Sequence, residues 1–288
     1  MGFVLNGMVE DSIIEYYNKT LNAYKDGWAL EKNRQLNMGL WFPGTKSLSE
    51  ALQNLNEELA RKANISAGHR VLDAGCGVGG TCIHLASRYD CNAYGITLVP
   101  GQVELAQRFA MESNVSDRTD FRIMNYCHTT FPDNYFDAIV GIESICHTPD
   151  KRSFLTEALR ILKPGGRLVF AENLQAKPRL TPEEHKILYT YAYEGCKIST
   201  LFTGEQYLTN LKELGFSDYK IDDVTPYIWP SIRRMRRLYY FAWIYNKYRA
   251  WAGRPFGPTE LAHTRMCYYL YTSLKRNLWS YGLVQATK

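Results

Sequence analysis

From residue 69 onward, short apolar runs alternate with longer segments in which apolar residues recur at helical spacing. The short runs predict strands, and the longer segments predict helices. The predicted strands cover 69–74, 91–96, 119–124, 136–142 and 166–172, and the predicted helices cover 79–89, 100–113 and 150–162. Regular alternation of strand and helix is typical of a parallel sheet with helices on both faces. We therefore predict an α/β fold built on a doubly wound, Rossmann-like sheet.

The segment before this alternation shows helical periodicity only. Residues 11–28 carry apolar side chains at helical spacing, and Ser47-Leu-Ser-Glu50 is the capping-box pattern of a second helix that ends near residue 63. We expect 1–66 to form an N-terminal helical cap over the site, and 67–288 to form the main domain.

Two insertions interrupt the later part of the chain. The pattern predicts a helical insertion over about 174–202, a helix over 204–214, a strand over 216–224, a second insertion over 225–275 and a final strand over 279–286. Both insertions begin where a strand has just ended, on the side where open α/β sheets bind ligands. We therefore expect both insertions to cover the substrate site.

Composition narrows the class of protein. The 288 residues are 45% apolar, which is enough for a substantial core. The longest aromatic-aliphatic run, Leu238–Tyr245, is far shorter than the roughly 20 residues of a membrane span, and the N-terminus shows no signal-peptide pattern. Seven cysteines are scattered without a Cys-x-x-Cys pair, which suits a reducing cytoplasm and argues against zinc. We expect a cytoplasmic protein with no metal and no integral membrane association.

The net charge of +5 is unevenly distributed. Between Asp223 and Glu260 there is no acidic residue, but seven basic residues occur there. The same segment holds ten aromatic residues: Tyr227, Trp229, Tyr239, Tyr240, Phe241, Trp243, Tyr245, Tyr248, Trp251 and Phe256. Aromatic walls suit a hydrophobic or cationic guest, and arginines suit a phosphate or diphosphate. The alternatives are an amphipathic helix with its aromatics in the core, peripheral membrane contact, and nucleic-acid binding, for which no recognised module is present.

Residues 71–80, Val-Leu-Asp-Ala-Gly-Cys-Gly-Val-Gly-Gly, are the most informative motif. They predict a buried strand that ends in a glycine turn and opens a helix. Asp73 places a carboxylate at the tip of the strand, and Gly75, Gly77 and Gly79 let backbone N–H groups approach a ligand. The segment resembles motif I of the class I S-adenosylmethionine (SAM) methyltransferases. The resemblance implies their seven-stranded fold, SAM as cofactor, and binding of SAM by Asp73, Gly75 and Gly77.

The second strand ends in Tyr94-Gly-Ile-Thr-Leu-Val-Pro-Gly-Gln102, without the carboxylate that often holds the ribose in this family. It is similar to a variant found in cyclopropane-fatty-acid synthases and in sterol and tocopherol methyltransferases. The resemblance implies that Thr97 and Gln102 replace the carboxylate, with Leu98 beside them. The alternative is that Gln102 is only a residue of the first helical turn.

The third strand leads into Met124-Asn125-Tyr126-Cys127-His128. Relatives commonly have Asp where Asn125 stands, so the resemblance implies that the Asn125 carbonyl oxygen accepts from the adenine amino group. Tyr126 and Ile142 complete the expected cofactor contacts. His128 is expected on the surface.

The fourth strand and its exit loop supply the candidate catalytic residues. Glu143 and His147 follow the strand at its carboxyl end, where the methyl group would lie. A carboxylate there attracts a cationic centre or accepts a proton, and a His acts as a base near neutral pH. Glu172 ends the fifth strand, where some sugar O-methyltransferases of the family have an acidic partner for the His. Alternatively, Glu143 caps a helix and His147 orders the loop.

The resemblance covers about residues 10–175 and is strongest to the tocopherol and sterol C-methyltransferase-like group, which includes prenyl diphosphate methyltransferases. We expect C-methylation of an isoprenoid alkene through a carbocation that Glu143 and aromatic faces stabilise. The alternatives are O- or N-methylation of a phenol, sugar or alkaloid, with His147 as base, and cyclopropanation of lipid chains. The expected partner is a small hydrophobic substrate, with or without a diphosphate, and not a nucleic acid; a homo-oligomer is an open alternative.

Overall fold

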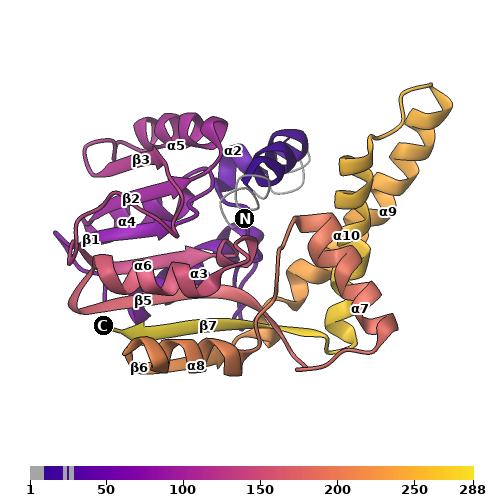
Figure 1. Ribbon diagram of the computed structural model, residues 1–288. Helices are drawn as coiled ribbons and strands as arrows, with labels where there is room; N and C mark the ends of the chain where they lie inside the picture. The colour runs from indigo at the N-terminus through magenta and orange to yellow at the C-terminus, as the bar shows by residue number, and fades with distance from the viewer. Residues whose placement is uncertain (1–9, 22–24, 26–28) are drawn as a thin grey trace.

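The computed structural model describes residues 10–21, 25 and 29–288, and its centre is one seven-stranded sheet (Figure 1). The strands are β1 (Arg70–Ala74), β2 (Asn92–Thr97), β3 (Thr119–Ile123), β4 (Phe136–Ile142), β5 (Leu162–Gln175), β6 (Ser217–Asp223) and β7 (Trp279–Thr287). Their order across the sheet is β3-β2-β1-β4-β5-β7-β6. The predicted doubly wound α/β sheet is confirmed.

The strand directions differ from the prediction at one place. β1 is parallel to β2 and β4, and β4 is parallel to β5, but β7 runs antiparallel to both of its neighbours. Alternation of strand and helix predicts only parallel strands, but β7 follows the second insertion and enters the sheet between β5 and β6 in the opposite direction, which local periodicity does not reveal. The order reverses between β1 and β4, and in open α/β sheets such a switch point is where ligands bind.

Both faces of the sheet are buried. Val71, Val140 and Val169 pack in one apolar cluster, while alternate residues such as Leu72 and Ile139 pack in another. This is the two-sided burial expected of parallel strands flanked by helices. The helices around the sheet are α3 (Leu48–Lys62), α4 (Gly80–Tyr89), α5 (Pro100–Glu112), α6 (Lys151–Ile161) and α8 (Gly204–Leu214).

The predicted N-terminal cap divides into two parts. Residues 10–21 form a helix; positions 22–24 and 26–28 of the predicted helix lie outside the described residues. After the short α2 (Leu30–Asn33), α3 packs against α4 and β5, and none of its residues lines the main pocket. Only the part of 1–66 before α3 therefore reaches the site.

The α3 capping box is half formed. Ser47 accepts a hydrogen bond from the Glu50 N–H at 3.2 Å, as the pattern predicts. The Glu50 carboxylate accepts from the backbone N–H of Lys46 instead of that of Ser47. The helix start is as predicted because one bond to the first turn is enough to set it.

Both predicted insertions are helical. The first contains α7 (Pro182–Tyr189) and a π-helical segment, Thr190–Gly195; the second contains the hairpin of α9 (Trp229–Trp251) and α10 (Pro258–Lys275). Figure 1 shows the end of α9 reaching well beyond the sheet. Among the described residues, no helix is both long and apolar enough to cross a membrane.

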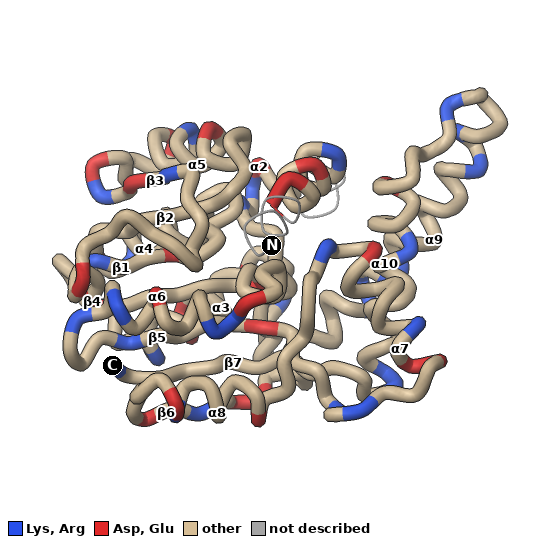
Figure 2. Tube along the Cα trace, in the orientation of Figure 1, with Lys and Arg blue, Asp and Glu red and all other residues tan. Residues whose placement is uncertain are grey.

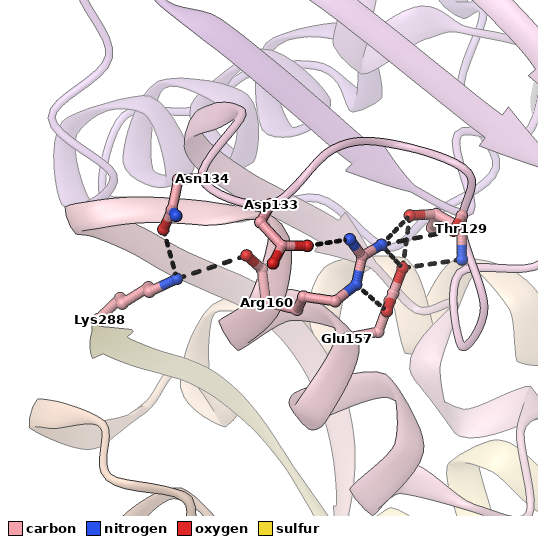
Figure 3. Close-up of polar contacts among 6 residues, drawn as sticks. All are labelled: Thr129, Asp133, Asn134, Glu157, Arg160 and Lys288. Carbon is pink, nitrogen blue, oxygen red and sulfur yellow. Dashed lines mark hydrogen bonds and ion pairs between the residues drawn. The ribbon is translucent and has the colours of Figure 1, made fainter.

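A polar network joins the end of β7 to the loop between β3 and β4 (Figure 3). Arg160 on α6 contacts Asp133 and Glu157, and Glu157 accepts from the Thr129 N–H at 2.8 Å. Lys288 donates to Asn134 at 2.8 Å. None of these residues lines the main pocket, so the network joins parts of the fold and takes no part in the site.

Candidate active site

The main pocket lies at the carboxyl ends of β1, β2 and β4, where the glycine turn opens α4. Only one glycine of the motif faces open space. A Cβ placed on Gly77, whose φ is +52°, would meet no atom within 4 Å, and Gly77 lines the pocket. This is the cradle in which a ligand can approach the backbone closely.

The other three glycines, Gly75, Gly79 and Gly80, are closely packed; a Cβ on Gly80 would lie 2.0 Å from the Arg34 carbonyl oxygen. A Cβ on Gly75, at φ +92°, would lie 2.3 Å from the Cβ of Ser144, and a Cβ on Gly79 would lie 2.8 Å from that of Ala106. Gly75 also lines the pocket, whereas Gly79 does not. The expectation that Gly79 helps to admit a ligand is therefore wrong; it lets α4 pack against α5.

Asp73 ends β1 and presents its carboxyl to the pocket. Its side chain is 3% exposed, and burial raises its pKa to about 7. The Cys82 thiol donates to the Asp73 carboxyl group at 3.8 Å, and no described residue forms an ion pair with Asp73. A buried carboxylate without an ion pair suits a cationic ligand group, because the ligand then supplies the missing charge.

Thr97 and Gln102 form one unit. The Thr97 hydroxyl accepts from the Val99 N–H at 3.3 Å and donates to Oε1 of Gln102 at 2.7 Å. This orientation leaves the Gln102 Nε2, on a residue that lines the pocket, as a donor. Both side chains are less than a tenth exposed. The arrangement fits a ligand hydroxyl, as expected from the resemblance to methyltransferases that lack a carboxylate here.

Gln102→Ala is expected to weaken SAM binding by about 1 to 2 kcal/mol, or roughly 5- to 30-fold in Kd, because one hydrogen bond is lost from a site that otherwise keeps its shape. Isothermal titration calorimetry measures it. Gln285→Ala, a change of the same type at a buried Gln of β7 outside the pocket, should leave Kd unchanged. An unaltered Kd in Gln102→Ala would mean that another residue binds the ribose of SAM.

Asn125 lies in a second, smaller pocket, which shares Leu98 and Tyr126 with the first. Its Oδ1 accepts from the Cys127 N–H at 2.8 Å, and its Nδ2 donates to Glu10 at 2.6 Å. The carbonyl oxygen expected to face adenine is thus already engaged, although a carbonyl has a second lone pair. Ile142 lines the main pocket. His128 is exposed, as predicted.

Glu143 stands directly after β4 in a left-handed conformation, φ +50°, which a Glu rarely adopts. Its Oε1 accepts from the Met38 N–H at 3.0 Å and from the Tyr281 hydroxyl at 2.8 Å. Burial raises its pKa to about 7, against the opposing effect of these two bonds. Glu143 forms no ion pair with any described residue. The site therefore contains a carboxylate poised between its charged and neutral forms.

His147 is 8% exposed and lines both pockets. Its Nδ1 lies 3.0 Å from the carbonyl oxygen of Lys197, and its Nε2 lies 3.1 Å from the Tyr17 hydroxyl. Because a carbonyl only accepts, Nδ1 carries the proton, and Nε2 keeps its lone pair. Burial lowers the pKa of His147 below its ordinary value of 6.5, so the ring is neutral at pH 7.

Glu172 does not partner His147, and that expectation is corrected. Glu172 is fully buried, and its two oxygens accept from the backbone N–H groups of Cys146 and Asn173, both at 2.8 Å. Burial raises its pKa to about 7. Glu172 therefore fixes the loop that carries His147, and the carbonyl of Lys197 takes the orienting role.

The insertions close the pocket with apolar side chains. The first contributes Tyr191, Cys196 and Ile198, and the α9–α10 hairpin contributes Met235, Met266 and Leu270. Both insertions thus reach the site, as predicted. None of the ten aromatic residues of 225–259 lines it, and neither do the seven basic residues, so the expected aromatic and cationic wall is absent from the pocket that the described residues form.

Three contacts at the site could not be predicted from the sequence. Tyr17 and Met38 come from the N-terminal segment, and Tyr281 comes from β7. Tyr281 lies 138 positions from Glu143, and a Tyr inside an apolar strand is the ordinary content of a core. Left-handed backbone at Glu143 and Lys197 is the kind of strain that gathers at functional sites, but it becomes visible only in the structure.

Comparisons with known proteins decide the family. The family model described as a methyltransferase domain matches residues 72–170. The chain is 30% identical over 230 residues to norajmaline N-methyltransferase of Rauvolfia serpentina, covering 75% of this chain and 78% of that protein. The chain belongs to the class I SAM-dependent methyltransferases. SAM is its cofactor. Asp73, Gly77 and Gln102, which are predicted to hold SAM, line the main pocket together.

Other relatives of this methyltransferase differ in the atom they methylate. It is 31% identical over 198 residues to 27-O-demethylrifamycin SV methyltransferase of Amycolatopsis mediterranei, covering 68% of this chain and 71% of that protein. Its fold matches a geranyl diphosphate methyltransferase with a TM-score of 0.75 at 19% identity, over 97% of this chain and 99% of the other. The enzyme therefore methylates a small molecule, and the comparisons leave the acceptor open.

Proposed function

We propose that this enzyme C-methylates an alkene carbon of an uncharged isoprenoid, with Glu143 as the proton acceptor. The observation that carries the proposal is the Glu143 carboxylate, which follows β4 at the pocket and has no cationic partner among the described residues. A sterol 24-C-methyltransferase among the relatives supports it.

SAM supplies an electrophilic methyl group, and S-adenosylhomocysteine leaves with the electron pair of the sulfur–methyl bond. As the alkene carbon bonds to that methyl, positive charge develops on the neighbouring carbon of the acceptor. In its ionised form Glu143 lowers the energy of that charge, and the aromatic rings of Tyr17, Tyr126 and Tyr191, which line the pocket, add to the effect. Glu143 then takes a proton from the adjacent carbon, and a new double bond neutralises the product.

The proposed acceptor carries no diphosphate. Arg34 is the one Arg or Lys among the described residues that line the main pocket, and its guanidinium is already bound to Glu112, Ser113 and the Phe109 carbonyl. A diphosphate buried here would find no uncommitted Arg or Lys among the described residues that line the pocket. This revises the diphosphate-bearing substrate that the basic insertion suggested.

The second candidate is O- or N-methylation with His147 as the base. The fixed tautomer favours it, because Nε2 of His147, a residue that lines the pocket, keeps its lone pair and accepts from the Tyr17 hydroxyl at 3.1 Å, and the ring is neutral at pH 7. The N- and O-methyltransferases among the relatives support it as well.

The test incubates the enzyme with isotopically labelled SAM and a panel of neutral isoprenoids, prenyl diphosphates, sterols, phenols and amines, and identifies products by mass spectrometry. We expect a new C–CH3 group on a neutral isoprenoid. Methyl transfer only to oxygen or nitrogen would establish the second candidate, and a diphosphate product would contradict the neutral acceptor.

The pH dependence of kcat separates the two bases. A base acts only when deprotonated, so with Glu143 as base kcat should rise with pH and level off, with a midpoint near the Glu143 pKa of about 7. With His147 as base the midpoint should lie below 6.5. The assay uses saturating SAM. The titration of Asp73, whose pKa is also about 7, then changes KM for SAM and not kcat. A midpoint below 6.5 that survives in Glu143→Gln would contradict our assignment.

A further inference from the structure

The distal half of α9 exposes an apolar stripe. Phe241 is 70% exposed, Ile244 is 59%, Tyr248 is 61% and Trp251 is 84%. Their spacing of three, four and three residues places them on one face of the helix. Such large side chains are normally buried in a monomer, so a continuous exposed row of them marks a surface that contacts something else.

Positive charge accompanies the stripe. Arg237 lies one turn before Phe241 on the same face, and Lys247 lies beside Ile244 and Trp251. Neither Arg237 nor Lys247 forms an ion pair with a described residue. Figure 2 shows Lys and Arg but no Asp or Glu along α9. The surface is therefore both apolar and cationic.

The same hairpin reaches the pocket at its other end. Met235 near the start of α9, and Met266 and Leu270 of α10, line the pocket, while the distal part of α9 extends away from the sheet (Figure 1). One helix therefore connects the exposed stripe with the apolar wall of the acceptor site.

We infer that the distal half of α9 docks on the surface of an anionic lipid bilayer, with the stripe at the boundary of headgroups and acyl chains. Trp and Tyr prefer that boundary because each ring has an apolar body and a polar edge, and Arg and Lys are attracted to anionic headgroups. Because Met235 and the stripe belong to the same helix, the docking holds the pocket within one helix length of the phase in which apolar acceptors dissolve. The inference does not depend on which acceptor is methylated.

Charge favours a bilayer over a second copy of this chain. Two α9 surfaces packed face to face would bring the Arg237 and Lys247 groups of both copies together without an acidic residue of α9 to neutralise them. An anionic bilayer offers complementary charge and an apolar layer at once.

The test is sedimentation of the full chain with vesicles of phosphatidylcholine containing about 30 mol% phosphatidylglycerol, or of phosphatidylcholine alone. We expect partitioning onto the anionic vesicles to be at least about 10-fold stronger and to weaken with salt. Phe241→Ser/Tyr248→Ser/Trp251→Ser and, separately, Arg237→Glu/Lys247→Glu should each lower it by about 10-fold or more. No methyl acceptor is involved, so failure here leaves the proposed function untouched.

Matched controls change exposed residues elsewhere. Met111→Ser/Ile123→Ser removes two apolar side chains that are 63% and 58% exposed on α5 and β3, and Lys46→Glu/Lys212→Glu reverses two exposed charges. Both should bind vesicles like the parent. Equal loss in the control and α9 variants, or no vesicle binding by the parent, would overturn the inference. So would self-association or single-stranded RNA binding that the α9 variants abolish while vesicle binding stays intact.

Discussion

Glu143→Gln is expected to lower kcat by about 100- to 10,000-fold, the range that a positioned general base contributes, while SAM affinity and KM for the acceptor stay nearly unchanged. The amide keeps the shape of the side chain and can still accept from Met38 and Tyr281, but it has neither the negative charge nor the basicity. Loss of the negative charge and of the base therefore slows the reaction only once bond formation to the methyl group has begun. Single-turnover kinetics with labelled SAM measures the step.

Two companion variants make the result specific. Tyr281→Phe removes a hydrogen bond that holds the pKa of Glu143 down, so the midpoint of the kcat profile should move above 7. His147→Asn keeps a donor for the Lys197 carbonyl but removes the base, and should cost less than Glu143→Gln. Near-normal turnover in Glu143→Gln together with an inactive, folded His147→Asn would replace our first proposal with O- or N-methylation.

Gly77→Leu is expected to weaken SAM binding by about 100-fold or more. The leucine side chain would occupy the open space beside the turn, and SAM could then no longer approach the backbone closely. Leu is not β-branched, so the left-handed backbone at φ +52° costs only about 1 to 2 kcal/mol of stability. Calorimetry measures the SAM Kd, and thermal unfolding measures the stability.

Gly68→Leu is the matched control. Gly68 also has a positive φ, +77°, and an added Cβ there would meet no atom within 4 Å, but Gly68 does not line the pocket. Both variants should lose similar stability, and only Gly77→Leu should lose SAM. Gly75→Val is a poor substitute, because its Cβ would collide with Ser144 and disturb the chain after β4. Equal SAM affinity in folded Gly77→Leu and the parent would contradict the assigned cradle.

The elements of the sheet could be predicted from the sequence because their signals are local. The alternation of apolar residues depends on neighbours within a few positions, and each predicted strand end agrees with β1 to β4 within about two residues. The chemistry at those ends could be predicted for the same reason. Asp73 and Thr97 lie at the carboxyl ends of β1 and β2, Glu143 directly follows β4, and parallel strands bring such residues to one edge of the sheet.

The partners of these residues could not be predicted in this way. Met38 and Tyr281 meet Glu143 across 105 and 138 positions, and the Lys197 carbonyl, not Glu172, orients His147. Such contacts depend on how separate elements pack, and periodicity carries no information about that. The raised pKa of Glu143 is a product of the same packing, because burial by distant segments causes it.

The basic and aromatic insertion shows the same division most clearly. Its composition, its helical spacing and its lack of acidic residues are properties of the sequence alone. Whether its aromatic side chains face the pocket or the solvent depends on which turns of α9 pack against the rest of the protein. The tertiary structure buries Met235 against the pocket, packs one side of the last turns of α9 against Phe256 and Glu260, and leaves the other side uncovered, so Trp251 is 84% exposed. A helix has no inside or outside until another element packs on it, and only the folded chain determines which face that is.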